Sequence, residues 1–220
     1  MLVIFAFFSM LLSAADPGWI PLFDGHTTKG WIDVAGQPFP TTSWRIEDGC
    51  LRAFDPGNGY QDIRTEAQYV NFELELEWKL NKNGNSGIKY LVQRADRWTN
   101  KTGLQSRARG LEYQLVDNES KDGASPDRST GSLYHVLAPK HQASKPLGEF
   151  NRSRLVVRGA HVEHWLNGEK VLEFETTDSE VWKNVGKLEM PPPPGQPTFI
   201  SLQNHGTPVW FRNIRIRPLP

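Results

Sequence analysis

The sequence predicts an all-β protein, a two-sheet antiparallel sandwich of the jelly-roll type. Three observations predict this fold class. Many short segments alternate apolar with polar residues, turns rich in glycine and asparagine separate them, and no long stretch has a helical period. The chain has 220 residues, which fits one large β domain or two small ones, and it contains no internal repeat.

The first fifteen residues, MLVIFAFFSMLLSAA, are apolar and end in small side chains. They are too few to cross a bilayer, which takes roughly 20 residues, and they resemble the apolar part of a secretory signal with its cleavage site. No lysine or arginine precedes the apolar run, which departs from that pattern. We expect residues 1–15 to be a signal peptide and residues 16–220 to form one exported domain, periplasmic or secreted, with no membrane attachment in the mature form. The alternative is that residues 1–15 form a buried N-terminal helix.

Several later segments have clear strand patterns. Residues 72–80 alternate apolar and charged positions without a break, as a half-buried antiparallel strand does. Residues 154–172 predict three strands with turns at Gly159-Ala160 and Asn167-Gly168, and Asn-Gly is a strong hairpin signal because both residues must take positive φ. Two more strands are predicted at residues 199–203 and 209–216.

Two stretches predict loops. Residues 118–130 are polar, and residues 190–197 are too rich in proline to join the interior of a sheet. Because strand patterns resume directly after the proline-rich stretch, we expect it to connect two parts of a single domain.

Residues 110–117 predict a strand with one polar face. Side chains on a strand alternate, so Glu112 and Gln114 point one way while the apolar residues between and beside them point the other. A sheet with one apolar face and one face rich in hydrogen-bonding groups suits a sugar-binding cleft. The alternative is an ordinary solvated face.

Two further segments share this polar alternation, residues 85–90 and 201–205. If the three strands are neighbours, six of their side chains share one concave face. They are Asn85, Lys89, Glu112, Gln114, Gln203 and His205. A cation, a carboxylate and an imidazole together are sufficient for proton transfer. The alternative is that Lys89 and Glu112 form only a cross-strand ion pair and that His205 is a turn residue.

Composition excludes several classes of function. The formal net charge is zero, from 25 basic and 25 acidic residues, which gives no electrostatic case for nucleic acid or an anionic membrane as partner. Cys50 is the single cysteine, so no internal disulfide is possible, and its position favours the core.

His161, Glu163 and His164 resemble a metal cluster, but they fall on different faces of one strand, so we do not expect a metal site using all three.

Short motifs follow one another along almost the whole of residues 16–220. They are Leu22-Phe-Asp-Gly25 with Gly30-Trp31, Trp44–Gly49, Asn85–Tyr90, Glu112-Tyr-Gln114 with Asp117, Gly131-Ser-Leu-Tyr134, Gly148–Asn151, Glu163–Gly168, Leu202–Gly206 and Phe211–Ile214. Each motif alone is weak, whereas their order and spacing are specific. Together they resemble the 3-keto-disaccharide hydrolase family, whose domain is built on the concanavalin-A-like jelly roll.

The resemblance implies chemistry on glycosides already oxidised at C3 of the sugar. A ketone at C3 acidifies the proton on C2, so that a base can remove it and give an enolate. The aglycone then leaves from C1, and water adds to the resulting glycal. This route needs a base, a stabiliser for the enolate oxygen and an acid for the leaving group.

For this chemistry we assign Glu112 and His205 as base and acid, in an order that stays open, with Lys89 as the third catalytic residue. Contacts with the carbohydrate substrate are assigned to Asn85, Gln114, Asp117, Tyr134, Trp165 and Gln203. We expect no cofactor and assign no metal ligand.

A divalent cation stays open. The chain departs from the family at three positions, and if a metal or a second carboxylate matters in some members, these changes put it in doubt here. Asn118 and Asn204 stand where the family often has aspartate, and His135 also replaces a frequent aspartate. The sugar, its linkage, the aglycone and the oligomeric state are left undetermined.

Two other functions remain as alternatives. The same jelly roll supports non-catalytic carbohydrate-binding modules, in which Trp98, Trp165 and Trp210 would stack on sugar rings. An ordinary endo-glucanase is disfavoured, because such enzymes use two carboxylates about the scissile bond and the Glu112 strand carries no close acidic pair.

Overall fold

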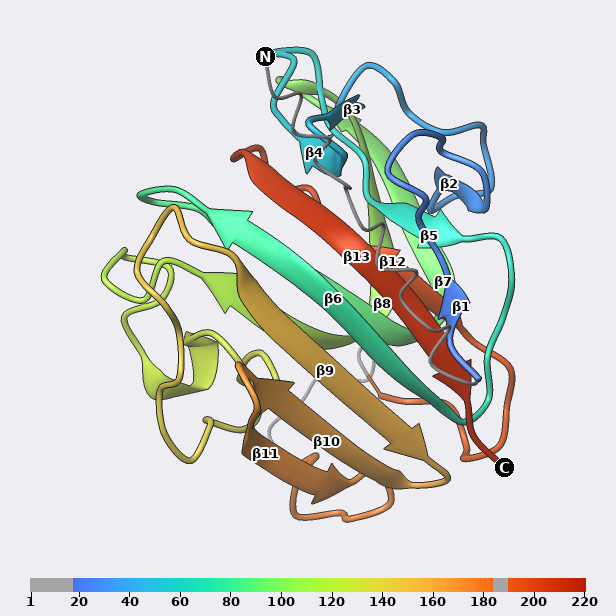
Figure 1. The fold of residues 1–220 in the computed structure, drawn as a ribbon, viewed down its shortest axis with the longest axis vertical. Helices are drawn as coiled ribbons and strands as arrows, with labels where there is room; N and C mark the ends of the chain where they lie inside the picture. The colour runs from blue at the N-terminus through green and yellow to red at the C-terminus, as the bar shows by residue number, and fades with distance from the viewer. Residues whose placement is uncertain (1–17, 184–189) are drawn as a thin grey trace, which may run out of the picture.

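The structure is a computed structural model that describes residues 18–183 and 190–220. Two antiparallel sheets pack face to face, as Figure 1 shows, so the predicted all-β jelly-roll sandwich is confirmed. The described residues contain one short 3-10 helix, Pro126–Arg128, and no helix among them is long and apolar enough to span a membrane. The predicted signal peptide, residues 1–15, lies outside the described residues.

The larger sheet has eight strands. They are β1 (Ile20–Pro21), β3 (Trp44–Glu47), β4 (Cys50–Ala53), β6 (Phe72–Leu80), β9 (Asn151–Arg158), β10 (His161–Leu166), β11 (Glu169–Glu175) and β13 (Val209–Pro218). The order is β11-β10-β9-β6-β13-β4-β3, with β1 also paired to β13. β13, red in Figure 1, therefore lies between β6 and β4.

The smaller sheet has five strands and carries the polar segments. They are β2 (Trp31–Asp33), β5 (Ile63–Thr65), β7 (Asn85–Asn100), β8 (Gly103–Val116) and β12 (Phe199–Leu202). The order is β2-β5-β12-β7-β8. The predicted adjacency of the three polar strands is thereby confirmed.

The predicted strands of the larger sheet and their turn are also confirmed. β6 covers the alternating segment, and β9, β10 and β11 are the three strands expected from residues 154–172. Asn167 and Gly168 take φ values of 51° and 92°, as the two central residues of a tight hairpin turn must.

The alternation along β6 has a direct structural cause. Its apolar side chains enter the core, while three glutamates face outward between β9 and β13, its two neighbours. The ion pairs are Glu73 with Arg154 and Arg217, Glu75 with Arg152 and Arg215, and Glu77 with Arg212. The outer face of the larger sheet is thus covered by charge pairs.

One hydrophobic core fills the space between the sheets. The larger sheet contributes side chains such as Trp44 and Phe211, whose rings stack with centroids 6.1 Å apart, and Cys50 is buried as predicted. The smaller sheet contributes Tyr90 and Tyr113, which are fully buried. Residues that alternate with these two tyrosines consequently face away from the larger sheet, on what we call the outer face of the smaller sheet.

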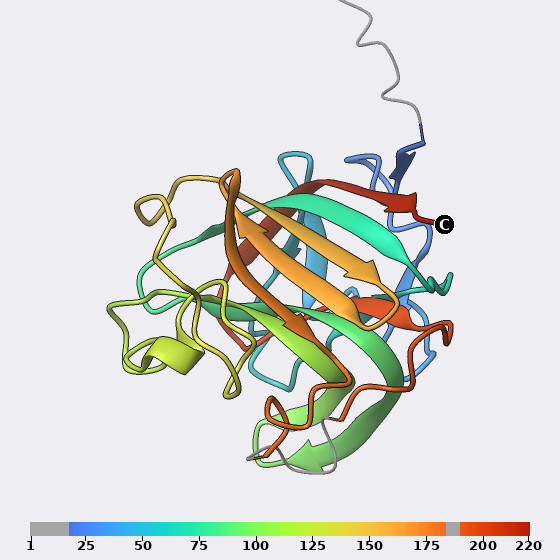
Figure 2. The same ribbon diagram turned by 90° about the horizontal axis from the view of Figure 1, so that it is seen from below.

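The β7–β8 hairpin folds over this outer face. Figure 2 shows the hairpin as a long curved ribbon. Ser106 of β8 forms a bridge with Gln61, which precedes β5, although β8 and β5 are separated by two strands in the sheet. The backbone N–H of Ala108 also donates to the Asp62 carboxylate at 3.0 Å. These contacts curl the smaller sheet around its outer face and make that face concave.

Candidate functional site

The register of β12, β7 and β8 brings several predicted residues into one cluster. Ser201 lies opposite Lys89, and Lys89 lies opposite Glu112. Gly87 and Gln114 are partners in the neighbouring row, two residues along each strand. Because opposite residues on neighbouring strands share a face, these side chains all belong to the concave outer face. The expected common face of the Lys89, Glu112 and Gln114 side chains is confirmed.

Lys89 and Glu112 form the centre of the cluster. The ammonium Nζ is 3.2 Å from the carboxylate Oε2, and the two side chains are only 11% and 10% exposed. Lys89 Nζ also donates to the backbone carbonyl of Ala108 at 3.3 Å. A charge pair so poorly exposed interacts more strongly than one in water.

Gln114 contacts the other oxygen of the Glu112 carboxylate. In the amide orientation that satisfies both its oxygen and its nitrogen, the Gln114 nitrogen donates to Glu112 Oε1 at 3.1 Å and to the Ser86 carbonyl at 3.0 Å. With Lys89 on Oε2, both carboxylate oxygens have a donor. The carboxylate is thus fixed in one orientation.

Asn85 connects the cluster to the loop that follows β8. Its Nδ2 donates to Asp122 Oδ2 at 2.9 Å. The side chain is 6% exposed and lies 3.5 Å from the Gln114 amide. Asn85 therefore belongs to the cluster that the sequence predicts, and it holds the 118–130 loop close to the polar face.

Two polar side chains of this face lack a hydrogen-bond partner within the described part of the chain. They are Gln203, through its Oε1, and Ser201, through its Oγ. Gln203 is 6% exposed and Ser201 is fully buried. Both atoms are closed to solvent, and a buried acceptor without a donor costs free energy. The sequence predicts Gln203 but not Ser201, which is indistinguishable from a core serine without knowledge of the register.

His205 lies at the edge of the cluster, in the loop after β12. The loop is attached to β7 on both sides of the histidine, because Gln203 N donates to the Gly87 carbonyl at 2.9 Å and Asn85 N donates to Thr207 Oγ1 at 2.9 Å. The imidazole is exposed, and within the described residues it makes no hydrogen bond to Lys89 or Glu112. His205 can therefore take its predicted role only with a substrate that extends from the Lys89–Glu112 pair to the loop after β12.

A buried aspartate that the sequence does not predict holds the base of this loop. Asp62 is fully buried and pairs with Arg107 at 2.9 Å. It also accepts hydrogen bonds from the backbone N–H groups of Ala108 and Asn204, both at 3.0 Å. Nothing in the sequence around Asp62 marks it, since the partners of its carboxylate are at least 45 residues away along the chain, and the nearest is Arg107.

Tyr134 and Asp117, two of the predicted substrate-binding residues, have different surroundings. Tyr134 is next to the pair, because its backbone N–H donates to the Glu112 carbonyl at 3.0 Å and it lines a cavity of about 20 Å³ beside Lys89 and Glu112. Asp117 accepts from the backbone N–H groups of Asn83 and Glu119, so its carboxylate organises a turn.

Trp165 is not brought to the cluster at all. It lies on β10 of the larger sheet, its Nε1 donates to Glu163 at 2.7 Å, and Arg154 stacks on its ring. A groove of about 510 Å³ is also separate, since Trp78, Asp117 and Leu147 line it and the Lys89–Glu112 pair does not.

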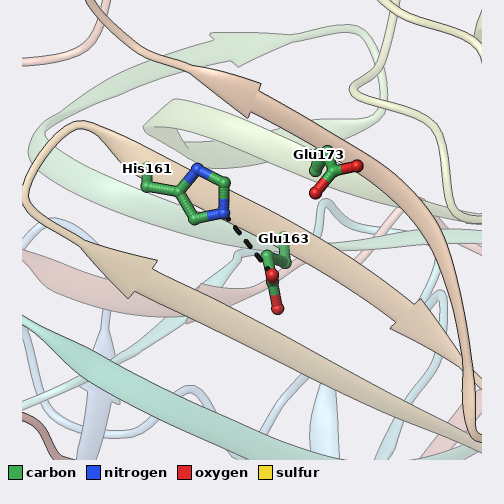
Figure 3. Close-up of side chains that lie close together, drawn as sticks. All are labelled: His161, Glu163 and Glu173. Carbon is green, nitrogen blue, oxygen red and sulfur yellow. Dashed lines mark hydrogen bonds and ion pairs between the residues drawn. The ribbon is translucent and has the colours of Figure 1, made fainter.

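The outer face of the larger sheet carries a second charged group, formed by His161, Glu163 and Glu173 (Figure 3). The His161 ring nitrogen is 3.4 Å from Glu163, and the ligand atoms of all three lie within 4.8 Å of one another. His164, which the sequence placed on the opposite face, is indeed in the core. Lys170 contacts both carboxylates, at 3.2 Å and 2.5 Å.

These contacts set the protonation of the group. Burial opposes the shift at Glu163, but hydrogen bonds from Trp165 and Lys170 lower its pKa. Hydrogen bonds from Lys140 and Lys170 lower the pKa of Glu173 to about 2. The carboxylates are already matched by ammonium groups, so the group is an ion-pair network and we assign it no metal.

Comparison with known proteins gives a consistent picture. Residues 18–217 match the family described as the 3-keto-alpha-glucoside-1,2-lyase-like domain. A 3-keto-disaccharide hydrolase of Bacteroides thetaiotaomicron is 34% identical, over 96% of this chain and 82% of that protein.

Solved structures agree with the fold. A candidate glycosyl hydrolase from Parabacteroides distasonis is 31% identical, with a TM-score of 0.75 over 92% of this chain and 94% of that one. A non-specific endo-β-1,3(4)-glucanase of glycoside hydrolase family 16 shares the fold at 11% identity and a TM-score of 0.53, over 92% of each chain. On the extent of the family match and of the Bacteroides relative, this chain belongs to the 3-keto-alpha-glucoside-1,2-lyase-like family.

Proposed function

We propose that this protein is an enzyme that cleaves 3-keto-glycosides, with 3-keto-disaccharides as the natural class of substrate. One observation carries the proposal beyond family membership. A carboxylate and an ammonium group are in contact on a concave, poorly exposed face that also presents carboxamides and an unpartnered acceptor. Such a face offers a base, a cation for a developing oxyanion and hydrogen bonds for sugar hydroxyls.

Glu112 acts as the base in this proposal. It removes the proton on C2, and the electron pair left behind is shared with the C3 carbonyl as an enolate. Lys89 stabilises the enolate oxygen, because its ammonium lies 3.2 Å from the carboxylate that takes the proton. The electron pair then forms the C1–C2 double bond while the bond from C1 to the aglycone oxygen breaks.

His205 is the proposed acid for the leaving group. Its loop is attached to β7 on both sides, and its exposed ring can exchange protons with solvent. The aglycone oxygen takes a proton there, and water subsequently adds across the double bond of the glycal. Elimination followed by hydration yields the same net products as hydrolysis.

A 3-keto-glucoside and its unoxidised parent test this function directly. We expect cleavage of the oxidised glycoside alone, because only its C2 proton is acidic enough for a side-chain base. Deuterium at C2 should slow the cleavage. Equal cleavage of both glycosides without an effect of C2 deuteration would indicate conventional hydrolysis instead. Binding of both without cleavage of either would indicate a carbohydrate-binding module. A chelator in the same assay tests the divalent cation.

Glu112→Gln tests the base. Glutamine preserves the shape of the side chain but cannot accept the proton, so kcat should fall by about 10²–10⁴-fold with the fold intact. Glu163→Gln is the matched control, since Glu163 is also an ion-paired glutamate on a strand but belongs to the larger sheet. It should retain the wild-type kcat. A wild-type rate for Glu112→Gln would remove Glu112 from the chemistry.

A further inference from the structure

Gly87 lies directly beneath the carboxylate of Glu112. A Cβ atom placed at residue 87 would lie 2.4 Å from Glu112 Oε1, 2.8 Å from its Cγ and 2.9 Å from its Cδ. These are the three nearest heavy atoms, and all belong to this one side chain. Gly87 is on β7, opposite Gln114 and next to the row of the Lys89–Glu112 pair.

The backbone does not explain this glycine. Gly87 is absent from the residues with positive φ, so any amino acid fits its conformation. Glycine in the interior of a strand is unfavourable and often marks a close approach of another group. Here the approaching group is the Glu112 carboxylate.

Glu112 cannot easily move aside for a larger residue. One carboxylate oxygen accepts from Gln114 and the other from Lys89, and the residue is 9% exposed. A side chain at residue 87 would push the carboxylate away from both donors. The overlap therefore costs more than it would at the free end of an exposed glutamate.

We propose that Gly87 is the positioning residue of the general base. This inference rests on the proposed function, in which Glu112 removes the C2 proton. The missing side chain at residue 87 lets the carboxylate lie flat on β7, between its two donors and facing the substrate. Displacement of a reacting group by about 1 Å can lower a rate roughly 10²-fold.

Gly87→Ala tests the proposal through the rate. We expect kcat on a 3-keto-glucoside to fall about 10²-fold, with KM changed less than about threefold, because the displaced group acts on the transition state. Gly87→Ala should have no further effect on kcat in the Glu112→Gln background, which has already lost the base. A kcat within about threefold of wild type, or an equal loss in both backgrounds, would overturn the proposal.

The control for strain is Gly123→Ala. Gly123 also lacks positive φ, and its added Cβ would meet the Asp117 carbonyl oxygen at 2.6 Å rather than Glu112. We expect this variant to lose stability to the same extent with and without the Glu112 side chain.

Stability gives a second readout that needs no substrate. Gly87→Ala should lower the free energy of unfolding in the wild-type background and not in the Glu112→Ala background, because the atoms it overlaps are then gone. An equal loss in both backgrounds would overturn the proposal even if the folded yield of Gly87→Ala is too low for kinetics. If the wild-type protein cleaves no 3-keto-glycoside, the proposed function fails, and this stability cycle still decides whether Gly87 positions Glu112.

Discussion

Gln203 costs the protein stability through one buried side-chain oxygen. Its Oε1 is buried on the concave face and has no donor within the described part of the chain. An unsatisfied buried acceptor costs about 1–3 kcal/mol. In the proposed function, a substrate hydroxyl that donates to this oxygen removes that cost on binding.

Gln203→Met separates these two effects. Methionine has nearly the same shape but no polar amide, so the free energy of unfolding should stay level or rise. KM for a 3-keto-glucoside should increase by about 5–150-fold, which corresponds to the loss of about 1–3 kcal/mol. Urea unfolding and steady-state kinetics measure the two quantities. An unchanged KM would show that Gln203 makes no contact with the substrate.

At the scale of elements, the β10–β11 hairpin depends on its turn. Gly168 has φ of 92°, and a Cβ atom built there would have no heavy atom within 4 Å. Glycine is therefore required at residue 168 only because of its backbone conformation. At residue 87, in contrast, glycine is required because the Glu112 side chain occupies the space of a Cβ atom.

Gly168→Ala should accordingly destabilise the protein by about 1–2 kcal/mol, the cost of the left-handed conformation for an L-residue. The activity of the remaining folded protein should equal that of wild type, since the turn is in the larger sheet. Thermal unfolding followed by circular dichroism measures the change. Loss of activity without loss of stability would contradict this separation of the two glycines.

Elements are also the level at which the sequence was most informative. Strict alternation in β6 and the Asn167-Gly168 turn follow from local chemistry, so their positions could be predicted. Pairing of β12 with β7 joins residues more than 100 positions apart, and no local pattern encodes that register. The shared face of Lys89 and Glu112 was predictable as a hypothesis from alternation. The roles of Ser201 and Gly87 depend on register and could not be predicted.

At the scale of the whole molecule, His164 connects the two sheets through the core. Its Nδ1 faces the Gly131 carbonyl at 2.9 Å, which can only accept, so this nitrogen carries the proton. Its Nε2 is 2.8 Å from the hydroxyl of Tyr90 and accepts from it. Complete burial lowers the pKa of His164 from 6.5 to about 4, although the hydrogen bond to Gly131 opposes the shift.

This shift predicts how stability depends on pH. Above pH 6.5 both the folded and the unfolded chain hold His164 neutral, so its contribution is complete. As pH falls from 6.5 towards 4, the unfolded chain binds a proton that the folded chain does not bind, and stability declines. The full loss is about 3 kcal/mol, of which about 2 kcal/mol should be lost by about pH 5.

Chemical denaturation at about pH 7.5 and pH 5 measures this loss, with His164→Gln as the comparison. The variant should lose less stability between the two pH values. His161, whose pKa is raised by its hydrogen bond to Glu175, has the opposite effect, but it is present in both proteins and cancels. The same pH dependence in both proteins would show that His164 is not the group responsible.

β13 has a consequence for how the protein is made. This strand is the last one described, yet it pairs with β1, β4 and β6 and joins the two halves of the larger sheet. While a ribosome is still completing residues 209–218, β4 and β6 have no partner along the edges that β13 later occupies. Such exposed edges are templates for pairing with other chains, so we expect aggregation to compete with folding until β13 is in place.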